Sequence, residues 1–89
     1  MNLNQIMLIE TLDEPIKVRA DFTGGQLTPL LFKRDGKTFR IRKINAHWED
    51  RRRQCKRHFF SVEAEGNIYE LHLDVLTMSW RLDRVCLNG

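Results

Sequence analysis

The sequence predicts an all-β domain, a small antiparallel sheet curled into a barrel or partly open barrel of SH3-like or OB-like size. Three observations predict this class. Apolar and polar residues alternate with period two over most of the chain, as in half-buried strands. Glycine-containing turn pairs separate the alternating segments. Two segments also change phase partway, which predicts strands bent by a β-bulge.

The chain length predicts one domain. A chain of 89 residues, with 42% hydrophobic and 30% charged residues, has the composition of an ordinary globular domain. We expect residues 1–89 to form this domain, with residues 14–89 as the barrel core and residues 1–13 as an N-terminal packing or dimerisation segment. A core of this size leaves little room for a deep catalytic cavity.

The first dozen residues fit two structures. The spacing of Leu3, Ile6, Met7 and Glu10 suits a helix, and "IMLIETL" equally suits an edge strand. If this segment does not fold back, its apolar side chains form an exposed patch, which usually marks contact with another chain. A homodimer formed through residues 1–12 is therefore one expectation.

Alternation becomes clear from Ile16 onward. Residues 16–22 predict a strand with these side chains on its apolar face: Ile16, Val18, Ala20 and Phe22. Gly24 and Gly25 supply the positive φ angles of a tight turn. Residues 27–32 predict a second strand, in which Pro29 requires an edge position or an irregularity because proline has no N–H.

Asp35-Gly36 predicts a type I′ hairpin turn. The returning segment, residues 37–48, changes phase. Its apolar residues all face inward only if the strand bulges near Arg42-Lys43, and that arrangement predicts a buried Trp48.

Three further strands are expected over residues 58–65, 68–75 and 79–87, with a turn at Gly66-Asn67 and a second phase change in the last strand. The segments "FRIRKI" (39–44) and "WRLDRV" (80–85) share a pattern, which indicates equivalent bulges or a coincidence between short strands. The residues expected to face the core are Trp48, Tyr69, Leu71, Leu73, Trp80 and Leu82.

Positive charge is concentrated in the middle of the chain. The formal net charge is +3, yet residues 33–57 contain eleven basic and three acidic residues. Five of the seven residues from Arg51 to Arg57 are Arg or Lys. Such asymmetry is evidence about partners rather than about fold.

Metal binding and catalysis are not expected from the sequence. Cys55 and His58 form a C-x-x-H pair that His47, His72 or Cys86 could complete, but structural zinc sites usually show two closely spaced pairs. The neighbouring cations would repel a metal ion, and no third group orients a Cys–His nucleophile. We therefore predict a non-enzymatic protein with no metal and no cofactor.

The order of several short motifs resembles a small uncharacterised bacterial domain family. These motifs are "EPIKV" (14–18), "DGKTFRI" (35–41), Trp48, "YELHLD" (69–74) and "WRLDRV" (80–85). The family occurs alone and appended to proteins related to Y-family translesion DNA polymerases. Phe39 stands where the family has Tyr, and Cys86-Leu87 where it often ends in Tyr-Asp. The resemblance implies an association with DNA metabolism.

Two functions remain open from the sequence. One is nucleic-acid binding through a single patch made by these cations: Arg40, Arg42, Lys43, Arg51, Arg52, Arg53, Lys56 and Arg57. The alternative is a protein-docking or self-associating module whose charges are solvated or paired with acids on neighbouring strands. No signal peptide or membrane-spanning run is recognisable, so we expect a cytoplasmic protein that does not bind membranes.

Overall fold

The computed structural model describes residues 7–52 and 56–88, and these residues form seven strands and no α-helix. The strands are β1 (Met7–Thr23), β2 (Gln26–Arg34), β3 (Lys37–Arg40), β4 (Lys43–Asp50), β5 (Arg57–Ala64), β6 (Asn67–Asp74) and β7 (Ser79–Asn88). All neighbouring strands are antiparallel, in the order β3-β2-β1-β7-β6-β5-β4. The predicted all-β class is confirmed.

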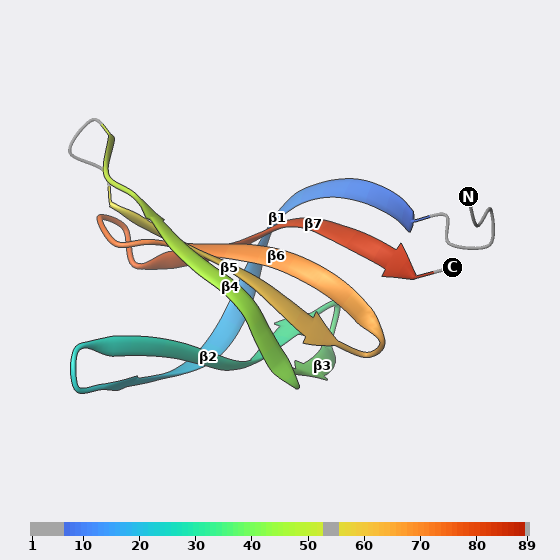
Figure 1. Ribbon diagram of the computed structural model, residues 1–89, viewed down its shortest axis with the longest axis horizontal. Coiled ribbons are helices and arrows are strands. Elements are labelled where there is room, and N and C mark those ends of the chain that lie inside the picture. Colours follow the sequence, from blue (N-terminus) through green and yellow to red (C-terminus); the bar gives the residue numbers. More distant parts are fainter. Residues whose placement is uncertain (1–6, 53–55, 89) are drawn as a thin grey trace.

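The sheet curls into a half-barrel (Figure 1). The long strand β1 joins its two parts, because residues 7–16 pair with β7 and residues 17–23 pair with β2. Strands β3 and β4 are the outer strands of the sheet, yet only Ile41 and Arg42 separate them in the chain. The Ile41 N–H donates to the Leu30 carbonyl at 3.0 Å, and the Arg42 N–H donates to the Glu63 carbonyl at 2.8 Å. The two edges of the sheet therefore meet at this link.

The predicted bulge near Arg42-Lys43 is instead a break between two strands. The chain changes partner here, from β2 to β5, whereas a bulge keeps the same partner. The extra residue lies a little later, at Asn45, because Ile44 pairs with Val62 and Ala46 pairs with Ser61.

The extra residue at Asn45 overturns the prediction that Trp48 is buried. Inserting one residue moves every following side chain to the opposite face. His47 therefore stacks on the core residue Phe60, with ring centroids 4.4 Å apart. Trp48 turns outward, is 42% exposed and stacks on Phe59.

The predicted phase change in the last strand is confirmed. In β7, Leu82 pairs with Leu71 and Arg84 pairs with Glu70, so Asp83 is the extra residue. Pro29 lies in the part of β2 that pairs with β1 alone, because β3 pairs only with residues 31–34, and it also lies at an irregularity, as predicted. The irregularity that it requires is the extra residue Leu30, since Ala20 pairs with Pro29 and Arg19 pairs with Leu31.

Of the three two-residue turns among the described residues, two lie where the sequence predicts them. Asp35 and Gly36 have φ angles of 51° and 76°, as a type I′ turn requires, and Gly24-Gly25 makes the other. The third turn is at Glu65-Gly66, one residue before the predicted position, so Asn67 already belongs to β6.

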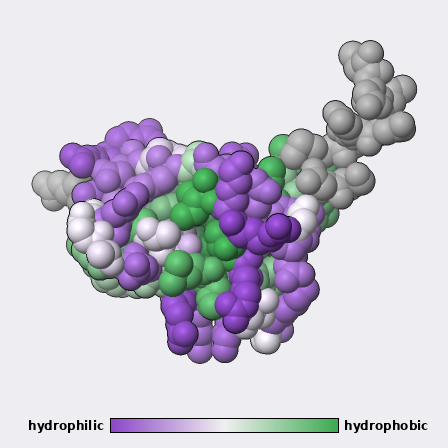
Figure 2. Space-filling model, turned by 60° about the horizontal axis from the view of Figure 1, so that its bottom comes forward, coloured by the Kyte–Doolittle hydropathy of each residue, from purple (hydrophilic) through white to green (hydrophobic). Residues whose placement is uncertain are grey.

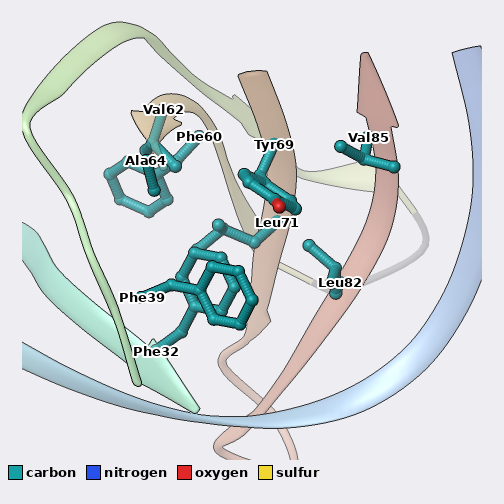
Figure 3. Packing of buried hydrophobic residues seen from close by; sticks show 9 residues of the cluster. All are labelled: Phe32, Phe39, Phe60, Val62, Ala64, Tyr69, Leu71, Leu82 and Val85. Carbon is teal, nitrogen blue, oxygen red and sulfur yellow. The ribbon is translucent and has the colours of Figure 1, made fainter. Parts of the chain in front are cut away.

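The core fills the inside of the curl (Figure 3). The Phe32 and Phe39 rings stack with centroids 4.9 Å apart, and the Tyr69 ring contacts both of them edge-on. Tyr69, Leu71, Leu73 and Leu82 are buried as predicted, and Trp80 is half-buried against this core. Phe22 was expected inside but is 73% exposed, because the β1–β2 hairpin extends beyond the core.

Candidate nucleic-acid interface

The basic run that dominates the sequence is largely neutralised in the structure. Arg51 Nη2 lies 2.8 Å from Glu49 Oε2, and Arg52 Nη2 lies 2.9 Å from Asp50 Oδ2. Lys56 lies 3.8 Å from Glu49, and Arg57 lies 3.9 Å from Asp74. Each described cation of the run thus faces a carboxylate, while Arg53 lies outside the described residues.

These contacts lower the pKa values of the Asp50 and Glu49 carboxyl groups. Hydrogen bonds from the Arg52 side chain and then from its backbone N–H lower the pKa of Asp50 from 3.8 to about 2. A side-chain hydrogen bond from Arg51 is the largest cause of the lowered pKa of Glu49. Exposed pairs of this kind contribute little to stability because solvent screens them, but they offset the positive charge that a phosphate would meet.

The seven predicted cations that the structure describes do not form one patch. Arg40 ends β3, Arg42 lies in the link and Lys43 begins β4, whereas Arg51 and Arg52 follow the end of β4. The eight residues of β4 separate the two groups by roughly 23 Å at a rise of about 3.3 Å per residue. The continuous patch expected from the sequence is therefore divided into two.

A different group of cations lies on one outer face of the half-barrel. Lys17 of β1 is directly opposite Lys33 of β2, while Arg19 is opposite Leu31, which in turn is opposite Arg40 of β3. We call Lys17, Arg19, Lys33 and Arg40 the cationic face. Within residues 7–52 and 56–88, none of these four cations has a carboxylate within ion-pair distance.

The cationic face borders a shallow groove. The groove has a volume of about 410 Å³, and its lining residues are Lys17, Val18, Arg19, Leu31, Lys33, Thr38 and Arg40. A second hollow of about 450 Å³ continues from Lys17 and Lys33 toward the β2–β3 turn at Asp35-Gly36. In Figure 2, which brings the β2–β3 side forward, hydrophilic residues flank an exposed strip of hydrophobic ones.

Like charges directly opposite each other destabilise a pair of strands, so folding alone does not explain Lys17 beside Lys33. An anion bound between them would relieve the repulsion. Lys17, Arg19 and Lys33 are not among the site residues predicted from the sequence, although the alternation of residues 16–22 puts Lys17 and Arg19 on one polar face. If the Gly24-Gly25 turn alone set the register of β1 and β2, Lys17 would lie opposite Phe32. The extra residue Leu30 shifts the register by one position, so Lys17 lies opposite Lys33 instead.

The chain was compared with protein-family models, curated proteins and solved structures, and none of the three comparisons found a match. No helix in the described part of the chain has the length and apolar character needed to cross a membrane.

Proposed function

We propose that this protein is a non-enzymatic module that binds nucleic acid through the cationic face. The supporting observation is the direct opposition of Lys17 and Lys33, with Arg19 and Arg40 beside them and no carboxylate partner among the described residues. Phosphate groups gain free energy at such a surface because binding releases their condensed counterions.

The shape of the surface suits an extended polyanion. Lys17 and Arg19 lie two residues apart on one strand, about 6.8 Å along it, and the groove remains open beside them. Leu31 and Val18 give the groove apolar lining against which sugars or bases can pack. The resemblance to domains appended to translesion polymerase relatives supports DNA metabolism as the process.

A pair of variants with equal loss of charge tests this proposal. K17S/K33S removes two cations of the cationic face, and R51S/R52S removes two cations of the ion-paired run. Binding of a fluorescent single-stranded oligonucleotide is measured by anisotropy from about 50 to 200 mM salt, a range over which phosphate contacts weaken steeply. We expect K17S/K33S to weaken binding roughly tenfold and to reduce the salt slope by about 1.4, since each single-strand contact contributes about 0.7.

R51S/R52S is the matched control, and we expect it to bind with nearly the wild-type affinity and slope. Duplex DNA and RNA of the same length, measured in parallel, identify the preferred nucleic acid. Equal losses in the two variants would show that only net charge matters and would contradict the assignment of the cationic face. Wild-type protein that binds none of the three polymers at about 50 mM salt would contradict nucleic-acid binding altogether.

The alternative, a docking or self-associating module, is favoured by one observation. Residues 7–16 of β1 pair with β7 alone, so the other edge of this segment is open within the described structure. Leu8 and Ile9 on this segment are 60% and 62% exposed. An open strand edge with exposed apolar side chains can pair with a strand of another chain.

The oligomeric state of the wild type and of I9K, measured by sedimentation, tests the docking alternative. The docking alternative expects a dimer in the wild type that I9K converts to a monomer, because a lysine on an edge strand opposes pairing. A monomeric wild type at all protein concentrations would contradict self-association through this segment.

A further inference from the structure

Three potential metal ligands converge at one end of the β4–β5 hairpin, away from the cationic face. His47, Glu49 and His58 each present a ligand atom, and these atoms lie within 4.8 Å of one another. His47 Nε2 is 3.0 Å from His58 Nδ1, and His58 Nδ1 is 3.6 Å from Glu49 Oε1. We call these three residues the His–His–Glu cluster.

Strand pairing holds the cluster in place. Glu49 and His58 are direct partners across β4 and β5, and His47 is two residues before Glu49, on the same face of β4. The His47 ring lies nearly parallel to the buried Phe60 ring, at 8°. The His58 side chain is only 15% exposed. The pairing of β4 with β5 and the stacking of His47 on Phe60 therefore restrict the positions of the two imidazole rings.

We propose that the His–His–Glu cluster binds a divalent transition-metal ion of the Zn²⁺ class. Imidazole nitrogen and carboxylate oxygen are ligands that Zn²⁺ prefers, and three protein ligands leave a fourth position open to water. Two nitrogens bound tetrahedrally at about 2.0–2.1 Å lie roughly 3.3–3.4 Å apart. The two imidazole nitrogens are hydrogen-bonded to each other at 3.0 Å. The metal ion replaces this hydrogen bond, and the nitrogens separate by only a few tenths of an ångström.

The two carboxylate oxygens of Glu49 contact different groups. Arg51 and Lys56 both lie against Oε2, whereas Oε1 faces His58. Arg51 and Lys56 reduce the affinity for a metal ion by charge repulsion, but they do not contact Oε1, the oxygen that would bind the metal.

No metal site was expected from the sequence, because Cys55 and His58 form only one close pair and neighbouring cations would repel a metal ion. His47 and His58 are eleven residues apart, a spacing that matches no zinc motif. The register of the β4–β5 hairpin brings His47 and His58 close together. The extra residue at Asn45 places His47 and Glu49 on the same face of the sheet as His58.

Calorimetric titration of the full-length protein with ZnCl₂ tests the proposal. We expect one Zn²⁺ per chain in the wild type. His47→Phe removes a ligand but keeps an aromatic ring against Phe60, so it should fold, which a thermal melt checks. We expect it to weaken binding at least about tenfold, the smallest effect usual for loss of even a supporting residue. His58→Gln should have a similar effect.

His72 provides the matched control because it is the third and last histidine of the chain. Its Nδ1 lies 2.9 Å from both carboxylate oxygens of Asp83. We expect His72→Gln to bind Zn²⁺ as the wild type does, and Zn²⁺ to shift the imidazole NMR signals of His47 and His58 but not those of His72.

Three results would overturn the proposal. One is undiminished binding by a folded His47→Phe variant. Another is equal movement of the His72 signals. The last is binding that disappears in Cys55→Ser while both histidine variants retain it, since a thiol would then be the ligand.

Discussion

Arg52 and Asp50 show how a basic residue in the sequence can be neutralised within its own loop. The Arg52 guanidinium and backbone N–H all donate to the Asp50 carboxylate, two residues earlier in the chain. The basic run therefore contains cations whose partners are their sequence neighbours Glu49 and Asp50. Counting charges along the sequence does not reveal such pairs, because it does not say where each side chain points.

The Asp50 carboxylate should titrate at a pH of about 2, measured by carbon NMR of the side-chain carboxyl. Because folding lowers this pKa, the stabilisation is fully present above the unfolded value of 3.8 and is lost as the pH falls from 3.8 to about 2. Arg52→Ser should raise the midpoint toward 3.8. An Asp50 that titrates near 3.8 in the wild type would contradict the pairing.

At the scale of the strands, single extra residues decide which side chains face the core. We expect Trp48→Ala to cost about 1 kcal/mol, the value of an exposed aromatic pair, because it loses mainly the contact with Phe59. Phe60→Ala should cost about 3–5 kcal/mol, as for other buried aromatic residues, since Phe60 is only 1% exposed. Urea unfolding measures both values. Equal large losses would instead support the buried Trp48 that the sequence predicts.

The cross-strand pair of Lys17 and Lys33 gives a prediction in which stability and binding change in opposite directions. Lys33→Glu replaces a repulsion by an attraction across β1 and β2, so it should stabilise the fold by roughly 0.2–1 kcal/mol. The same change should weaken nucleic-acid binding. Urea unfolding and anisotropy on the same sample check the two effects. A destabilised variant with unchanged binding would show that Lys33 has a structural role.

The strands themselves were largely predictable from the sequence. Period-two alternation and the Asp35-Gly36 turn predict the β2–β3 hairpin because both signals are local. The cationic face and the His–His–Glu cluster were not predictable. Both depend on extra residues, at Leu30 and Asn45, whose positions are determined by pairing with a strand elsewhere in the chain.

Basic residues that are clustered along the sequence are spread over the surface of the folded molecule. Residues 33–57 contain most of the basic residues, but the described ones lie apart in the curled sheet. They lie on the cationic face, at the β3–β4 link, in the ion-paired run, and in pairs with Glu14 and Glu65. Lys17 and Arg19, which lie outside that segment, join Lys33 and Arg40 across three strands. The cationic face is thus assembled by the fold rather than by one stretch of chain.

Chemical-shift mapping tests the assignment of the cationic face most directly. Isotope-labelled protein is titrated with a single-stranded oligonucleotide near 150 mM salt, where exposed charges farther apart than about 8 Å are largely screened. We expect the largest amide shifts at residues 17–19, 31–33 and 38–40, with small shifts at residues 49–52 and 56–57. Shifts concentrated at residues 49–52 and 56–57, with none on β1 and β2, would contradict the assignment.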